Sequence, residues 1–194
     1  MQLSKFYLIA FLVTTLILSA VIMCSAEEID VWRSKPLTTI NWDKLISAVI
    51  QVESGGDYNA VSPQGCIGLM QINPNGALAE WNNTTYQDRH YTYYSDGTSF
   101  LEYRQHEKYT RHDLLNMDIN IKIGTWYLHR IEEHYLKEHL FNVDYADDTS
   151  IIKLILAAYN GGITRLKKCN YDINCMPRET RNYVRKVMRI YKGE

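Results

Sequence analysis

Glu53 is the residue of this chain whose surroundings best suit it to chemistry. It ends an apolar stretch, and a glycine-rich, polar sequence follows over residues 54–56 (SGG) and 62–71 (SPQGCIGLMQ). We expect the second of these segments to fold back across the glutamate, so that its carboxyl group lies between an apolar wall and a cleft. Burial of this kind raises the pKa of a carboxyl group, which then keeps its proton near neutral pH. Such a proton donor suits acid-catalysed cleavage of a glycosidic bond.

The sequence shows no clear second acid beside Glu53. Most glycosidases use two carboxylates, one to donate the proton and one to stabilise the positive charge at the anomeric carbon. Asp57 is close in sequence, but Gly55-Gly56 turns the chain and no pattern directs Asp57 to the same place. A glutamate without further context is usually a solvated charge at a helix end. The case for Glu53 therefore depends on the sequence around it.

Capping residues and apolar periodicity predict a mainly helical α+β domain that positions this glutamate. The predicted elements, in order, are a helix capped by Asn41 and running to about Glu53, a loop over 57–66, a short buried segment over 67–72, a helix from Met117 to about Leu140, a helix capped by Thr149 and stopped by Gly161-Gly162, and a helix with Pro177 in its first turn.

Residues 75–113 interrupt the helical pattern with an aromatic-rich insertion. Asp96-Gly97 stands at its centre between aromatic and β-branched residues, which predicts a small β-hairpin. A connection this long in a compact domain is usually functional or flexible. A flap on the substrate cleft and an inert surface insertion are both compatible with the sequence.

The first 26 residues have the features of an export signal. Lys5 precedes an apolar run over residues 6–23, and Cys24-Ser25-Ala26 supplies small residues for cleavage. Cleavage is the favoured reading, an uncleaved membrane anchor is the second, and a lipoprotein linked at Cys24 is the third. All three export the rest of the chain to the periplasm or the extracellular space, with a lead-in over 27–40 and the domain over 41–194.

The composition of the exported part gives further expectations. Removal of residues 1–26 takes away only one charged residue, Lys5, so the net charge changes from −1 to −2, which gives no basic field for nucleic acid. Cys169 and Cys175 enclose a turn-rich loop, and a disulfide between them is expected after export. Cys66 is then expected to be a small buried residue without a partner.

Four sequence blocks in order resemble the soluble lytic transglycosylase catalytic domain, a lysozyme-like fold related to goose-type lysozymes. The resemblance covers about residues 41–192. It rests on ESGGDYNAVSPQGCIGLMQINP from Glu53, NIKIGTWYL from Asn120, AAYNGG from Ala157 and ETRNYV from Glu179.

The resemblance implies roles for residues that match these blocks. Glu53 matches the catalytic glutamate, and Tyr159 matches a tyrosine that sits near it. The remaining matches, expected to line the substrate groove or support it, are Ser62, Met70, Gln71, Asn160 and Glu179. Met70 could also be only a core residue, and Asn160 only a helix terminator.

The family resemblance also implies a reaction. Such enzymes use a single acid/base and no metal or organic cofactor, which agrees with the missing second acid. Glu53 would protonate the bond between MurNAc and GlcNAc in peptidoglycan, and the MurNAc 6-hydroxyl would close on C1 to give a 1,6-anhydro end. The sequence departs from the family pattern in two places. One is Cys66, where the family commonly has alanine, and the other is the long insertion at 75–113.

The sequence also raises the questions of a metal site, of other functions and of possible partners. His129, His134 and His139 are spaced by five, which does not bring them to one helix face, so a metal site is not expected. A hydrolytic muramidase and a non-catalytic glycan-binding scaffold are the alternatives to the lytic transglycosylase. A secretion, conjugation or phage apparatus is a plausible partner, and the sequence does not choose among these.

Overall fold

The computed structural model describes residues 40–84, 90–93, 99–102, 107–142 and 148–194. The chain divides into two units, residues 1–39 and 40–194, and the first unit lies outside the described residues. The predicted apolar run over 6–23 therefore also lies outside them. Among the residues that the structure describes, no helix has both the length and the apolar character needed to cross a membrane.

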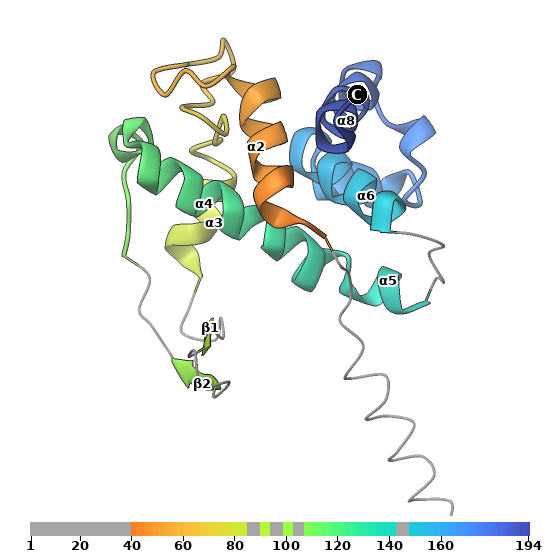
Figure 1. Ribbon diagram of the computed structural model, residues 1–194, viewed down its shortest axis with the longest axis horizontal. Helices are drawn as coiled ribbons and strands as arrows, with labels where there is room; N and C mark the ends of the chain where they lie inside the picture. The colour runs from red at the N-terminus through yellow and green to blue at the C-terminus, as the bar shows by residue number, and fades with distance from the viewer. Residues whose placement is uncertain (1–39, 85–89, 94–98, 103–106, 143–147) are drawn as a thin grey trace, which may run out of the picture. The chain divides into compact units, whose positions relative to one another are not determined.

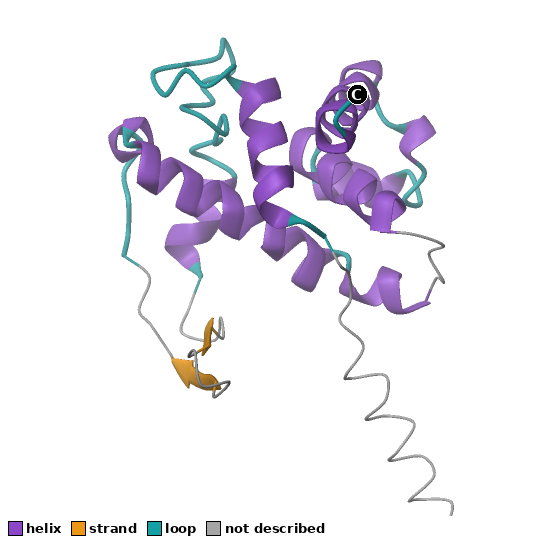
Figure 2. Ribbon diagram, in the orientation of Figure 1, coloured by secondary structure: helices purple, strands orange, loops and turns teal. Residues whose placement is uncertain are grey.

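The second unit is mainly helical, as predicted (Figures 1 and 2). Its elements are α2 (Trp42–Glu53), α3 (Ala77–Asn83), β1 (His90–Tyr93), β2 (Ser99–Glu102), the 3₁₀ turn η1 (His112–Leu115), α4 (Met117–Arg130), the π-helical turn η2 (Ile131–Tyr135), α5 (Lys137–Asn142), α6 (Asp148–Gly161), α7 (Ile163–Lys168), the 3₁₀ turn η3 (Ile173–Cys175) and α8 (Arg178–Lys192).

The core forms where four helices and one loop bring apolar side chains together. α8 packs against both α2 and α6, α6 also packs against α4, and α3 packs on α4 (Figure 1). Each of these helices except α3 contributes a side chain with no exposed surface, and so does the loop that precedes α3. These side chains are Leu45 in α2, Met70 in the loop, Leu128 in α4, Ile155 in α6 and Val187 in α8.

Local sequence sets both ends of α2. The Asn41 side chain caps its start by accepting a hydrogen bond from the Lys44 N–H over 3.0 Å. At the other end, Ser54 is the C-cap, and Gly55 and Gly56 both take positive φ values of 64° and 89°. Glu53 is thus the last residue of the helix, as the sequence predicts.

The predicted helix from Met117 to about Leu140 is wrong as one continuous element. α4 ends at Arg130, the π-helical turn η2 follows, and α5 begins at Lys137. A π turn inserts extra backbone into the helix, and apolar spacing on either side does not reveal it.

Two predicted helix starts also need correction. α6 begins at Asp148, so Thr149 lies inside its first turn and is not its cap. Pro177 is the residue immediately before α8, where its extended ψ of 150° leads into the helix. Proline is tolerated at both positions because neither needs a backbone N–H.

The insertion contains more helix than predicted. α3 lies inside residues 75–113, and its Trp81 is buried. β1 and β2 pair antiparallel, with His90 opposite Glu102 and Tyr93 opposite Ser99. The predicted turn at Asp96-Gly97 lies outside the described residues, so the hairpin remains a prediction.

Two side chains of α3 bind the later part of the insertion, at Glu107 and Tyr109. Asn82 uses its amide twice: its Oδ1 accepts from the Tyr109 N–H (3.0 Å) and its Nδ2 donates to the Tyr109 carbonyl (2.7 Å). The Trp81 indole N–H donates to the Glu107 carbonyl over 2.7 Å. The chain therefore leaves the C-terminal end of α3 at Thr84 and is bound to the same end of that helix again at Glu107 and Tyr109.

Candidate active site

Glu53 stands where α2 ends and the glycine-rich loop begins. Its side chain is half-buried, and this burial raises its pKa from the usual 4.5 to about 7. A hydrogen-bonding effect of the Tyr183 hydroxyl acts in the opposite direction and is the smaller of the two. Near neutral pH, a substantial fraction of Glu53 therefore carries the proton that a general acid needs.

Two tyrosines from different helices lie close to the Glu53 carboxyl group. Burial raises the pKa of both Tyr159 in α6 and Tyr183 in α8 well above the ordinary value, and the charge of Glu53 raises them further. Tyr159 donates its hydroxyl proton to the Met70 carbonyl over 2.8 Å. The buried Tyr183 hydroxyl has no partner at normal hydrogen-bond distance among the described residues, although it is close enough to act on the pKa of Glu53.

The loop segment 67–72 is fixed beside this carboxyl by side chains from three helix regions. Ser54, at the end of α2, donates to the Leu69 carbonyl over 2.9 Å. Asn120 of α4 accepts from the Met70 N–H over 2.8 Å, and Tyr159 of α6 binds the carbonyl of the same residue. The segment is also closed on itself by a bridge between Ile67 and Ile72. Its position relative to Glu53 is thus set by the helices and not by the loop alone.

Asn120 is the central polar residue of this arrangement. Only 1% of its surface is exposed, and its Nδ2 donates to the carbonyls of Ile67 and Leu114, both over 2.8 Å. Gly68 passes so close that a Cβ atom there would lie 2.3 Å from Asn120 Nδ2 and 2.7 Å from the Leu114 carbonyl. Glycine is required at 68 for this approach and for its φ of 78°.

Met70 is fully buried, and α4 has a glycine opposite it. A Cβ at Gly124 would lie 2.4 Å from the Met70 sulfur atom and 3.0 Å from its Cβ. The structure therefore shows Met70 as a core residue that joins α4 to the loop beside Glu53.

Two of the predicted groove residues hold the loop itself. The Ser62 hydroxyl accepts from the Cys66 N–H over 3.0 Å. Gln71 has a φ of 47°, unusual for a residue with a side chain, and its Nε2 donates to the carbonyls of Ala60 (3.1 Å) and Gly68 (3.0 Å). These bonds give Ser62 and Gln71 a structural role next to the catalytic candidate.

Asn160 and Glu179 are exposed, and neither side chain forms a hydrogen bond or ion pair with any residue that the structure describes. Asn160 follows Tyr159 near the end of α6, and Glu179 is in the first turn of α8. Their roles in substrate binding stay predictions. Cys66 is a free, half-buried thiol, close enough to Tyr159 for its charge to raise the pKa of that tyrosine.

Tyr183 and Asn120 are the site residues that sequence reasoning missed. Tyr183 fits the apolar stripe of α8, and periodicity does not show that its hydroxyl faces Glu53. Asn120 stands on the buried side of α4 among isoleucines, in the sequence NIKI. A polar amide in an apolar stripe was the available signal, because a buried amide requires partners.

Among the described residues, no group of three or more His, Cys, Asp or Glu side chains is arranged so that it could hold a metal ion. His129 instead packs against the Trp42 ring with centroids 3.9 Å apart, and His139 stacks on Tyr171 at 3.6 Å. Burial lowers the pKa of both histidines.

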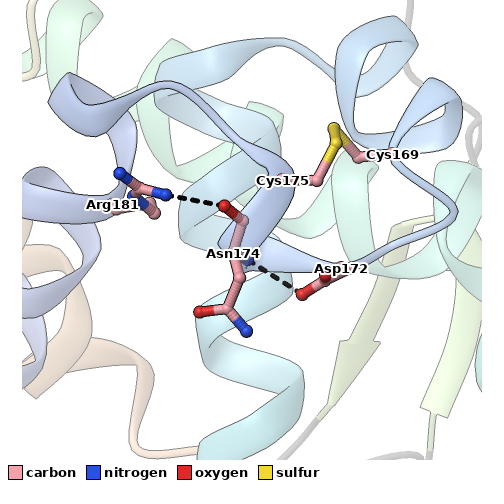
Figure 3. The surroundings of a disulfide bond; sticks show 5 residues. All are labelled: Cys169, Asp172, Asn174, Cys175 and Arg181. Carbon is pink, nitrogen blue, oxygen red and sulfur yellow. Dashed lines mark hydrogen bonds between the residues drawn. A yellow bond between two sulfur atoms is a disulfide. The ribbon is translucent and has the colours of Figure 1, made fainter.

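Cys169 and Cys175 form a disulfide with their Cα atoms 5.6 Å apart (Figure 3). The enclosed loop is further fixed by Asp172, which accepts from the Asn174 N–H over 2.9 Å. The Asn174 carbonyl then accepts from Arg181 of α8 over 2.7 Å (Figure 3). The disulfide loop is thus tied to the helix that carries Tyr183.

A comparison with protein families matches residues 30–95 to the transglycosylase SLT domain. The matched residues include Glu53 and the whole loop segment 67–72. They do not include the sequence blocks around Asn120, Tyr159 and Glu179. A search among curated proteins finds no match. The family match and the mainly helical fold agree with the resemblance seen in the sequence. The chain is therefore similar over residues 30–95 to the transglycosylase SLT domain, and this similarity supports a lytic transglycosylase type of domain that acts on the glycan strands of peptidoglycan.

Proposed function

We propose that the chain is a peptidoglycan lytic transglycosylase in which Glu53 is the only acid/base. The observation that carries this proposal is the raised pKa of Glu53, about 7, at the helix end that lies within the matched SLT segment. A carboxyl group with this pKa can both donate and accept a proton near neutral pH. A single residue can therefore serve both halves of the reaction.

In the first half, Glu53 protonates the oxygen of the β-1,4 bond between MurNAc and GlcNAc as the bond to C1 breaks. The substrate's own acetamido group supports the positive charge that develops on the sugar. In the second half, the carboxylate of Glu53 takes the proton of the MurNAc 6-hydroxyl, and this oxygen bonds to C1. The product has a 1,6-anhydroMurNAc end, and Glu53 is protonated again.

The two tyrosines support these steps in different ways. Tyr159 uses its hydroxyl to hold the Met70 carbonyl, which keeps the loop in place beside the carboxyl group. The unpartnered hydroxyl of Tyr183 is available to donate to Glu53 once the glutamate has lost its proton. Such a donor stabilises the carboxylate between the two proton transfers.

A substitution of Glu53 tests the proposal. Glu53→Gln keeps the shape of the side chain but cannot transfer a proton, so release of soluble fragments from purified peptidoglycan should fall by at least about a hundredfold. Asp57→Asn is the matched control, because Asp57 is an exposed carboxylate four residues away that accepts from the Asn59 N–H, as asparagine also can. It should keep nearly full activity.

The two variants separate the candidate functions. A comparable loss in Asp57→Asn would contradict a single acid/base. A folded wild-type protein that binds peptidoglycan but releases nothing would instead favour the non-catalytic scaffold.

We also propose that the domain acts outside the cytoplasm, in the periplasm or the extracellular space. The support is the sequence of residues 1–26 and the location of peptidoglycan itself. Fractionation of cells that express the full chain tests this, and recovery only with cytoplasmic protein would contradict it. Local wall opening for a secretion, conjugation or phage apparatus is the role we expect for such a domain.

A further inference from the structure

α8 concentrates positive charge to a degree that the rest of the chain does not. Its 15 residues contain six Lys or Arg and one Glu, a net charge of +5, whereas the whole chain has a net charge of −1. The catalytic proposal uses only the buried side of this helix, through Tyr183. The charged side is therefore not explained by the active site.

Five of the six cations form a single stripe. At 100° per residue, Arg178, Arg181, Arg185, Arg189 and Lys192 fall within a sector of about 80° and extend over about 21 Å of helix. All five are exposed. Tyr183 and Val187 lie on the opposite side, where they are buried against the core. We call these five residues the cationic stripe.

The stripe is not neutralised within the protein. Among the described residues, none of its members forms an ion pair. Arg181 donates to the Asn174 carbonyl (Figure 3). Arg185 donates to the Asn182 side chain over 3.1 Å, and both acceptors are uncharged. Like charges at i, i+4 repel one another on a helix, so the row has a cost in the free protein that an anionic partner would remove.

The form of the stripe fits a chain-like polyanion better than a membrane surface. Surfaces that bind lipid usually combine cations with apolar side chains that enter the bilayer. The exposed apolar residue of α8, Ile190 at 39%, lies about 140° around the helix from the middle of the stripe. Four of the five members are arginines, whose planar guanidinium groups bind carboxylates in pairs of hydrogen bonds.

We propose that the cationic stripe is a second peptidoglycan-binding surface, which takes the carboxylates of the stem peptides. This inference rests on the proposed function for the identity of the polymer. Stem peptides recur along each glycan strand, so they present anionic groups in a row. Because the stripe is on the side of α8 away from Tyr183, it would hold the domain on the wall without occupying the catalytic cleft.

Co-sedimentation with purified sacculi, freed of other wall polymers, tests the stripe separately from cleavage. The full chain carries Glu53→Gln throughout, so that the sacculi stay intact and binding does not depend on activity. Arg185→Glu with Arg189→Glu removes the middle of the stripe. Lys108→Glu with Lys137→Glu is the control, because both lysines are exposed, lie outside α8 and give the same change in net charge.

The stripe variant should bind about tenfold more weakly at low salt, and the control variant should bind as the parent does. Sacculi whose carboxylates have been converted to amides should lose the parent protein to a similar degree. If circular dichroism shows that the charge reversal harms folding, Arg185→Gln with Arg189→Gln provides the neutral version, with a smaller loss expected.

Two results would overturn the inference. One is equal binding of sacculi by the stripe and control variants. The other is a loss seen only with vesicles that contain anionic lipid, which would assign the stripe to a membrane surface. Failure of either kind leaves the catalytic proposal intact, because the Asp57 and Glu53 variants test that separately.

Discussion

At the scale of single residues, the proposed chemistry depends on the burial of Glu53. The carboxyl group is at a helix C-terminus, where the partial negative charge of the helix also disfavours a second negative charge. Its pKa is about 7, above the usual 4.5. The general acid is the protonated form, so raising the pH removes the active species.

We therefore expect kcat/KM to be nearly constant below about pH 6, to fall by about half at pH 7, and to approach a tenfold decrease per pH unit above about pH 8. The sign follows from the direction of the shift, since an acid with a raised pKa loses its proton only when the pH passes the raised value. Rates on soluble peptidoglycan fragments across this range provide the measurement. A fall in kcat/KM that begins near pH 4.5 would show that Glu53 has an ordinary pKa.

Tyr183→Phe tests whether the Tyr183 hydroxyl acts on the Glu53 carboxyl group. The Tyr183 hydroxyl lowers the pKa of Glu53, so its removal should move the basic limb of the pH profile to higher pH. Because this buried hydroxyl has no other partner, the thermal midpoint should not fall. Tyr159→Phe is the comparison, and it should lower stability because it leaves the Met70 carbonyl without its donor. An unshifted limb in Tyr183→Phe would separate that residue from the chemistry.

The sequence predicted the position of Glu53 but not all of its partners. The glutamate could be found because a helix cap, a glycine pair and an apolar stripe all fix where α2 ends. Tyr183 could not be assigned, because its ring fills a core position and spacing does not report the direction of a hydroxyl group. Ser62 and Gln71 were expected to line the groove, which stays a prediction, and the structure shows that they hold the loop together.

At the scale of elements, the segment 67–72 depends on residues distant in the sequence. Asn120 supplies one acceptor and two donors to it and to the end of η1. Removing this side chain leaves the Met70 N–H and the Leu114 carbonyl without their partner in a buried site, whereas the Ile67 carbonyl keeps its bond from the Ile72 N–H. Each such group costs about 1–3 kcal/mol, in part recovered by relaxation and water.

Asn120→Ala should therefore lower the free energy of unfolding by about 3 kcal/mol. Chemical denaturation of the variant and the wild type gives the value. Asn174→Ala is a suitable control, because Asn174 is exposed and forms its hydrogen bonds to Asp172 and Arg181 with backbone atoms alone (Figure 3). A loss below about 1 kcal/mol in Asn120→Ala would mean that water replaces the amide readily.

Element boundaries were predictable where a capping residue marks them and not where the backbone departs from regular geometry. Asn41 and Gly55-Gly56 marked both ends of α2 correctly. The π turn at Ile131–Tyr135 divided a segment that looked continuous, because its apolar residues still face the core on both sides. α3 was missed because it has only seven residues, too few for a periodic pattern.

At the scale of the whole molecule, the disulfide links the C-cap of α7 to the 3₁₀ turn η3, which precedes α8. Closing a loop of this size stabilises a domain by about 2 kcal/mol through the entropy of the unfolded chain. A reductant should therefore lower the thermal midpoint of the wild type, and Cys169→Ser with Cys175→Ser should reproduce this decrease. Cys66→Ser is the control, because Cys66 is free, and its response to reductant should match the wild type. Equal midpoints with and without reductant would contradict a stabilising role.

The mainly helical fold of the whole domain could be predicted because the four sequence blocks lie on or beside helices of a single fold. α2 carries Glu53, α4 carries Asn120, α6 carries Tyr159 and α8 carries Tyr183, and the packing of these helices brings the four together. The cationic stripe was not evident from the overall composition, since a net charge near zero conceals a strong local imbalance.

The most direct test of the central claim is mass spectrometry of the soluble products that the protein releases from purified peptidoglycan. We expect muropeptides that end in 1,6-anhydroMurNAc, and these should be absent when Glu53→Gln replaces the wild type. Products with reducing MurNAc ends, heavier by about 18 Da because water has been added, would contradict it. That result would make the protein a hydrolase that uses the same acid.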